Sequence, residues 1–129
     1  MSSINILIVD DELEVAEALT FVLPIEWEST ICIDPLEVKK ILEQEKFDLI
    51  ITDLQMPKLS GLELVKTLRS QNIQIPIFIS TGFSKSDSTV QEALNAGAQG
   101  VIPKPFLDMA AVIHEIETYF QKIINTAGC

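Results

Sequence analysis

Short apolar runs alternate along the chain with segments whose apolar residues recur every three or four positions. The short runs predict buried strands, and the helical spacing predicts amphipathic helices. We expect five strands, over Ile4–Val9, Ser29–Ile33, Phe47–Thr52, Ile75–Ser80 and Gly100–Ile102. A helical segment follows each strand. This alternation predicts an α/β fold, a doubly wound parallel sheet with helices on both faces.

The helical segments start and stop at residues that suit helix ends. We expect helices from about residue 13 to 22, 36 to 44, 62 to 70 and 86 to 96, and a last one capped by Asp108. Asp34 is expected as the N-cap of the second helix, with Pro35 at its first position. Gly97 is expected to end the fourth helix in a left-handed conformation. The apolar face of the last helix comprises Val112, Ile113, Ile116, Phe120 and Ile123.

The size and charge of the chain narrow the class of protein. Its 129 residues suit a single domain over 1–129, with a core from about residue 4 to 124 and a frayed tail over 125–129. No apolar run approaches the roughly 18 residues of a membrane span, and no signal peptide is present, so we expect a cytoplasmic protein. A net charge of −10 argues against a nucleic-acid-binding face and favours a metal cation or a basic protein partner. Cys32 and Cys129 are not expected to form a disulfide.

Polar side chains follow four of the predicted strands. Asp10 and Asp11 come after the first, Asp53 after the third, Thr81 after the fourth and Lys104 after the fifth. Each has an ordinary explanation alone, because paired acids cap helices, threonine is common in turns and a lysine before proline is usually solvated. A parallel sheet brings these strand ends to one edge, where ligands bind. The combination therefore predicts a functional site.

Electrostatics indicates what such a site would hold. Two carboxylates about 4 Å apart repel by roughly 4 kcal/mol at an effective dielectric constant near 20, and one lysine offsets only part of the charge of three acids. Carboxylate oxygens without a nearby Cys or His favour Mg²⁺, since His114 lies on the last predicted helix. Asp53 could then attack a phosphoryl group and form an acyl phosphate. Lys104 and Thr81 would stabilise the oxygens of the transferring group.

Four motifs occur in order along the chain and carry a family resemblance. They are LIVDDE at Leu7–Glu12, TDLQMPKLSGLEL at Thr52–Leu64, STG at Ser80–Gly82 and KPF at Lys104–Phe106. Over about residues 4 to 122 the chain resembles the CheY-like receiver domains of two-component response regulators. The resemblance implies a flavodoxin-like fold with strand order 2-1-3-4-5.

The resemblance also implies residue roles. Asp53 would be the phospho-acceptor, and Asp10, Asp11, Asp53 and the main-chain carbonyl of Gln55 would hold Mg²⁺. Thr81 would be the switch hydroxyl of the family and Lys104 the site lysine. The family usually has a cis peptide bond after that lysine, so we expect one between Lys104 and Pro105.

The resemblance further implies partners. A sensor histidine kinase or a histidine phosphotransfer protein would supply the phosphoryl group, docking near the first helix and the loop after Lys104. The fourth helix, fifth strand and fifth helix would carry the signal to an unknown downstream protein or output domain. The domain would catalyse its own phosphorylation and dephosphorylation without turning over an external substrate. No direct contact with nucleic acid or membrane is expected.

Two positions depart from the family pattern. Receiver domains usually carry Tyr or Phe three residues before the site lysine, and here Val101 stands there. A short branched side chain cannot sweep the volume of a ring, so we expect the loop after Thr81 to carry the output signal. The second position is Phe83, two residues after Thr81, whose ring we expect to slow hydrolysis of the acyl phosphate, unless it points away into solvent or against the next helix.

Two other function classes remain open at the level of sequence. The chain could be a receiver-fold interaction module that works without phosphorylation, although the intact acids, Thr81 and Lys104 argue against this. It could also be a metal-dependent phosphatase with an aspartyl nucleophile, like haloacid dehalogenase-like enzymes. Those enzymes carry a second Asp two residues after the nucleophile, where this chain has Gln55. Whether the domain stands alone or belongs to a larger regulator or hybrid kinase also stays open.

Overall fold

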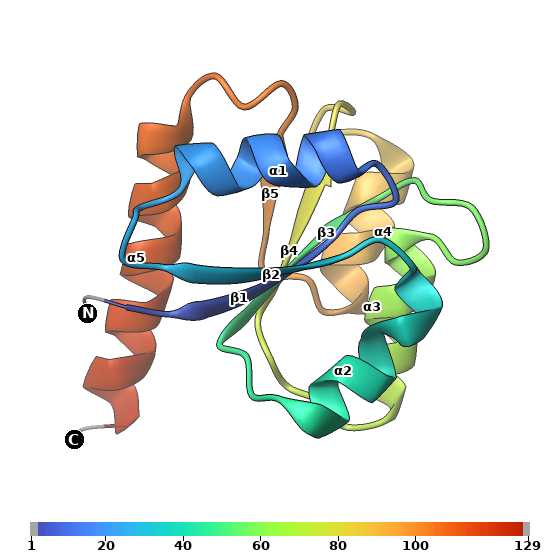
Figure 1. Cartoon of the computed structure of the whole chain (residues 1–129), viewed down its shortest axis with the longest axis horizontal. Helices are drawn as coiled ribbons and strands as arrows, with labels where there is room; N and C mark the ends of the chain where they lie inside the picture. The colour runs from blue at the N-terminus through green and yellow to red at the C-terminus, as the bar shows by residue number, and fades with distance from the viewer. Residues whose placement is uncertain (1–2, 128–129) are drawn as a thin grey trace.

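A computed structural model describes the backbone of residues 3–127 and the side chains of residues 3–122. Five parallel strands form one sheet in the order β2-β1-β3-β4-β5, as predicted (Figure 1). The strands are β1 (Asn5–Val9), β2 (Glu28–Cys32), β3 (Leu49–Asp53), β4 (Ile77–Thr81) and β5 (Gly100–Pro103). This is the doubly wound, flavodoxin-like α/β architecture that the sequence predicted.

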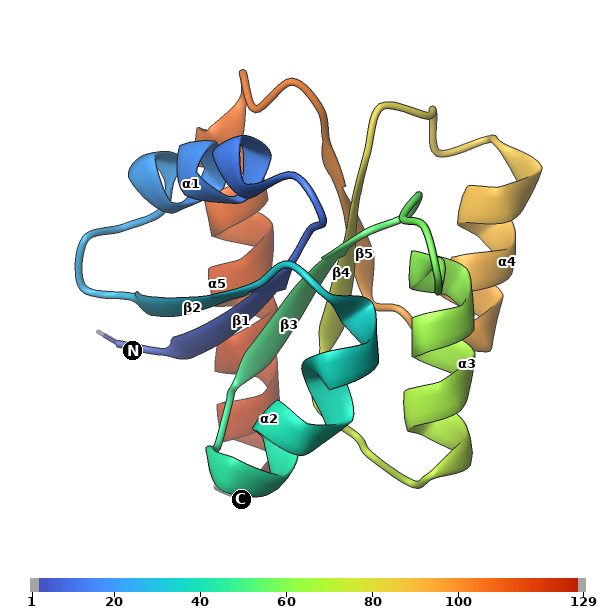
Figure 2. The same cartoon turned by 45° about the vertical axis from the view of Figure 1, so that its right-hand side comes forward.

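The helices cover both faces of the sheet. They are α1 (Leu13–Val22), α2 (Val38–Gln44), α3 (Gly61–Ser70), α4 (Ser88–Ala96) and α5 (Met109–Ala127), with a short 3₁₀ helix η1 (Pro35–Glu37) before α2. Figure 2 shows α1 and α5 on one face and α2, α3 and α4 on the other. No helix in the described part of the chain is long and apolar enough to cross a membrane.

Alternate strand residues point to opposite faces and build two apolar cores. Leu7, Ile50 and Ile79 pack with α2, α3 and α4, and Ile51 and Phe78 pack with α1 and α5. The central strand β3 is buried along its whole length, because helices cover both of its faces. The sheet therefore holds the carboxyl ends of β1, β3 and β4 in fixed positions.

The strand ends differ slightly from the prediction. β3 and β4 include Asp53 and Thr81, which were expected just beyond the strands, because parallel pairing continues to the pairs Asp53 with Ser80 and Thr81 with Pro103. β2 lies one residue earlier than predicted at both ends. Two polar site residues thus belong to the rigid sheet itself.

The helix ends agree with the sequence in part. Asp34 caps as predicted, by accepting a hydrogen bond from Leu36 N, but Pro35 opens η1 and the α-helix begins only at Val38. Gly97 ends α4 with φ +127°, as expected. Ser60 and Glu63 form a capping box at the start of α3 that the prediction did not include.

The C-terminal segment and the cysteines complete the comparison. Helical backbone continues to Ala127, whereas an irregular tail was expected from Asn125. Residues 128–129 lie outside the described residues, and so does the side chain of Ile123. Cys32 is a buried free thiol, and its predicted lack of pairing with Cys129 stays a prediction.

Candidate functional site

Three carboxylates meet at the carboxyl edge of the sheet. β1 and β3 are neighbours, with Val9 paired to Thr52, so the residues after them come side by side. One carboxylate oxygen each from Asp10, Asp11 and Asp53 lies within 4.8 Å of the others. Asp10 and Asp53 are buried, with 3% and 7% exposure, and Asp11 is half-buried. The predicted convergence of the three acids is present.

Lys104 reaches this cluster from the far side of β4. Its Nζ lies 3.1 Å from Asp53 Oδ1 and 3.3 Å from Asp10 Oδ2. The backbone holds the residue in place, because Lys104 N donates a hydrogen bond to Thr81 O at 2.8 Å. The predicted cis peptide bond between Lys104 and Pro105 is also present. One ammonium offsets only part of the charge of three carboxylates, as the sequence indicated.

Burial and charge shift the pKa values of the two central groups. Burial raises the pKa of Asp53 above its ordinary value, and hydrogen bonding and attraction from Lys104 offset this only in part. Burial acts to lower the pKa of Lys104, but the hydrogen bond and charge of Asp53 and the charge of Asp10 outweigh it and raise that pKa. Lys104 therefore stays protonated and positively charged. The raised pKa of Asp53 means that its environment favours binding of a proton or of a further cation by the carboxylate.

Local backbone contacts hold the acids in position. Glu12 N donates a hydrogen bond to Asp10 Oδ1 at 2.9 Å, which fixes the carboxylate while α1 begins. Gly61 packs directly on the end of β3, where an added Cβ would overlap Asp53 O and lie 2.9 Å from Leu54 Cα. The small size of Gly61 lets the loop after Asp53 fold back against the strand.

Thr81 and Phe83 form the next part of the rim. The Thr81 side chain is buried, and its Oγ1 accepts a hydrogen bond from Phe83 N at 3.0 Å. The Phe83 side chain is 39% exposed and lines a cavity of about 470 Å³ with Gln55 and other residues of the loop after β3. Phe83 and Gln55 thus line the same cavity, although they belong to the loops after two different strands. The structure does not test the role predicted for the Gln55 carbonyl.

An apolar groove runs beside the site, between α1 and the segment Lys104–Phe106. Its volume is about 590 Å³, and Val15, Ala18 and Val22 line its α1 side. In the sequence, Val15, Ala18, Leu19 and Val22 recur at helical spacing. In the structure Leu19 is buried together with Ala16, whereas Ala18 is exposed and Val22 is 36% exposed. The apolar residues of α1 thus line the groove on one side and pack into the core on the other.

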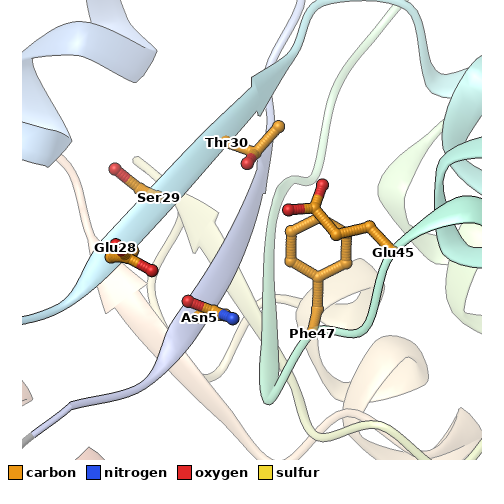
Figure 3. A pocket seen from close by; sticks show the side chains of 6 residues that line it. All are labelled: Asn5, Glu28, Ser29, Thr30, Glu45 and Phe47. Carbon is orange, nitrogen blue, oxygen red and sulfur yellow. The ribbon is translucent and has the colours of Figure 1, made fainter.

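A separate polar pocket of about 410 Å³ lies at the other end of the sheet (Figure 3). Its walls come from the starts of β1 and β2 and from the segment between α2 and β3. Glu28 and Glu45 contribute carboxylates, and the Phe47 ring lies against the pocket wall (Figure 3). Because these residues precede their strands or begin them, the pocket is remote from Asp53.

The donor set fits a hard divalent cation. Asp10, Asp11 and Asp53 offer only oxygen atoms, and they are the one group of three or more potential metal-ligating side chains among the described residues. Oxygen-only ligation with a partly exposed side suits Mg²⁺, which keeps several waters. His114 is exposed on α5, as expected for a residue outside the site.

Comparison with known proteins places this geometry in a family. A family model described as response regulator receiver domain matches residues 6–117. The chain belongs to the response regulator receiver domain family. Receiver domains act within two-component systems, where they interact with histidine kinases and output domains.

Two curated relatives show how this receiver domain compares with longer regulators. A protein-glutamate methylesterase/protein-glutamine glutaminase from Bradyrhizobium diazoefficiens is 30% identical over 97% of the chain, which covers 35% of that protein. Response regulator protein PilR from Pseudomonas aeruginosa is 35% identical over 81% of the chain, which covers 24% of that protein. The receiver domain thus spans about a third or less of the length of these relatives.

Solved structures agree with the assignment. A CheY-like response regulator receiver domain protein from Methanospirillum hungatei is 27% identical, with a TM-score of 0.80 over 94% of this chain and 96% of the other. The FixJ-N crystal structure is 32% identical, with a TM-score of 0.79 over 91% of this chain and 93% of the other. The fold extends over nearly the whole chain in both comparisons.

Proposed function

We propose that this receiver domain is a cytoplasmic, phosphorylation-controlled switch that accepts a phosphoryl group on Asp53. The donor would be the phosphohistidine of a sensor kinase or of a phosphotransfer protein. The observation that carries the proposal is the contact between Lys104 Nζ and the buried Asp53 carboxylate at 3.1 Å, beside two further acids. A nucleophilic carboxylate with a fixed cation next to it suits transfer of an anionic group.

The residues of the site divide the chemistry among them. An oxygen of Asp53 forms a bond to phosphorus while the bond from phosphorus to the donor imidazole nitrogen breaks, and that nitrogen takes up a proton. Lys104 neutralises charge on the oxygens of the transferring group. The Thr81 hydroxyl accepts a hydrogen bond from Phe83 N and keeps its own proton free to donate to one of those oxygens.

A divalent cation would complete the charge balance. Asp10, Asp11 and Asp53, with the main-chain carbonyl of Gln55, would hold Mg²⁺. When bound, Mg²⁺ supplies neutralising charge to the phosphoryl oxygens and to the acceptor carboxylate. Glu12 N supports the arrangement by fixing Asp10 from behind at 2.9 Å.

The groove beside α1 suits the donor protein. It opens next to Lys104 and is lined mostly by apolar side chains, including Val22 and Phe106. The chain carries no Lys, Arg or His before Lys39, so the α1 side of this groove has acidic side chains, including Glu14, and no basic ones. A partner helix with apolar residues flanked by basic ones would match both properties.

The test is incubation with acetyl phosphate and Mg²⁺, followed by intact-mass measurement of the wild type and of Asp53→Asn. The proposal predicts a stable adduct of one phosphoryl group on the wild type and none on the variant. A wild type that forms no adduct would instead be a phosphorylation-independent interaction module. Sustained release of inorganic phosphate without an adduct would indicate a phosphatase, and either outcome would refute the switch.

A further inference from the structure

The hydroxyl of Ser80 stands out among the buried polar groups. Its Oγ is the one buried side-chain nitrogen or oxygen in the described part of the chain that has no hydrogen-bond partner. The residue is 3% exposed. Burying a hydroxyl without a partner is unfavourable, and most buried hydroxyls are therefore bonded. An unpaired hydroxyl next to a functional site indicates a group that is bonded in another state of that site.

The sheet register places Ser80 beside the acceptor carboxylate. Ser80 pairs with Asp53 of β3 on one side and with Ile102 of β5 on the other. Residues paired in a parallel sheet point to the same face, and Ile102 belongs to the core formed with α1 and α5. Ser80 therefore lies on that face, between an apolar neighbour and Asp53.

Lys104 must cross β4 on the same face. The residue follows β5 two positions after Ile102, yet its Nζ contacts Asp53 at the end of β3, and β4 lies between those strands. The next position along the chain on this face is Gly82, one residue after the end of β4. A Cβ at Gly82 would meet no atom within 4 Å, so the lysine stem does not pass over that residue. Phe78 and Ser80 are the β4 side chains on that face, and Ser80 is the one nearer to the end of the strand where Lys104 lies.

The Lys104 ammonium has one N–H group that is not directed to the acids. An ammonium carries three N–H groups, and here two of them are directed to Asp53 and Asp10. If a cation binds the three acids, it competes with Lys104 for the Asp10 oxygen. The ammonium would then need another acceptor to remain above Asp53.

We propose that Ser80 is a positioning residue for Lys104, whose Oγ accepts an N–H of the ammonium once a divalent cation and a phosphoryl group occupy the site. This inference rests on the proposed function. Ser80 acts through Lys104 and does not contact the reacting atoms. Its hydroxyl has no hydrogen-bond partner in the unloaded domain. In the loaded domain it accepts a hydrogen bond from the Lys104 ammonium.

If Ser80 positions Lys104 only in the loaded domain, its substitution should affect the loaded domain and not the unloaded one. A purely structural role would affect both. In the unloaded domain, Ser80→Ala removes a hydroxyl without a partner, so the melting temperature should not fall. With Mg²⁺ and beryllofluoride, a phosphoryl mimic, the same variant lacks a hydrogen bond to a charged group. Its affinity for beryllofluoride should fall about tenfold.

The experiment measures melting temperature with and without Mg²⁺ and beryllofluoride, and beryllofluoride affinity by ¹⁹F NMR. The proteins are wild type, Ser80→Ala, Lys104→Met and the double variant. The loss of affinity caused by Ser80→Ala should disappear in the Lys104→Met background. Ile79→Val is the matched control, since Ile79 is the neighbouring residue on the opposite face of β4 and should alter both states equally.

Three outcomes would overturn the proposal. Equal shifts of melting temperature with and without the mimic would make Ser80 purely structural. A loss that persists in the Lys104→Met background would show that the hydroxyl acts on another group. A wild type that binds no beryllofluoride would refute both the proposed function and this inference. The first two outcomes would refute only the role of Ser80.

Discussion

The backbone N–H of Phe83 donates a hydrogen bond to Thr81 Oγ1 at 3.0 Å, so the hydroxyl and the loop after β4 are directly linked. If the Thr81 hydroxyl turns towards a phosphoryl group, this bond must lengthen or carry Phe83 with it. Phe83 is 39% exposed and beside a cavity, so it has room to move. We therefore expect the loop that begins at Gly82 to change conformation first when Asp53 is phosphorylated.

Phe83 should control the lifetime of the phosphorylated state. Phe83 lines a cavity together with Gln55, and we expect its ring to hinder the in-line approach of water to an acyl phosphate on Asp53. Phe83→Ala should shorten the half-life several-fold, while Phe83→Leu, which keeps an apolar side chain, should stay near wild type. The half-life is measured by intact mass after removal of the donor. Equal half-lives in the wild type and Phe83→Ala would show that the ring does not shield the bond.

The conformation of Val101 should not change when the site is phosphorylated. Its side chain is 3% exposed and packed in the core formed with α2, α3 and α4, where a short branched side chain has no room for large rotation. Amide chemical-shift changes on adding Mg²⁺ and beryllofluoride should be largest over residues 82–87 and small at Val101. Changes centred on Val101 would contradict signalling through the loop.

The pH dependence of phosphorylation should respond to Mg²⁺. Burial raises the pKa of Asp53, so its protonated, non-nucleophilic form persists to higher pH than for an ordinary aspartate. The rate with acetyl phosphate should therefore fall as pH decreases through that raised pKa. A bound cation favours the carboxylate, so higher Mg²⁺ concentration should move this fall to lower pH. An acid limb that does not move with Mg²⁺ concentration would argue against a metal in contact with Asp53.

Arg69 should hold the opposite end of the sheet together. Its guanidinium donates hydrogen bonds to the carbonyls of Gly97, Ile73 and Ile75, at 2.7 to 3.2 Å. Arg69→Met leaves these carbonyls without that donor and should lower the free energy of unfolding by about 2 kcal/mol. Lys66→Met is the control, because the Lys66 to Glu92 pair is 4.0 Å long and exposed and should contribute less than about 0.5 kcal/mol. Urea denaturation measures both, and equal effects would show that the network adds nothing.

Local sequence patterns predicted the α/β class and the meeting of the site residues, whereas the strand order followed from the family resemblance. Asp10, Asp53 and Lys104 could be placed because each closes an apolar run, and a parallel sheet aligns such ends. The capping box is also a local pattern, because Ser60 and Glu63 stand three residues apart, the characteristic spacing of the motif.

Contacts between distant residues could not be predicted in this way. The partners of Arg69 lie up to 30 positions away, and the unpaired hydroxyl of Ser80 depends on strands from three parts of the chain. The end of β3 at Asp53 follows from pairing with Ser80, which no local pattern reveals. The groove that Val22 lines is closed on its other side by Lys104–Phe106, a segment from a distant part of the chain.

Chemical location of the phosphoryl group tests directly whether Asp53 is the acceptor. Borohydride reduces an aspartyl phosphate to homoserine, which peptide mass spectrometry can assign to one position. After treatment with acetyl phosphate and Mg²⁺, we expect homoserine at Asp53 and at no other aspartate. Homoserine at Asp10 or Asp11 with Asp53 unmodified would contradict it.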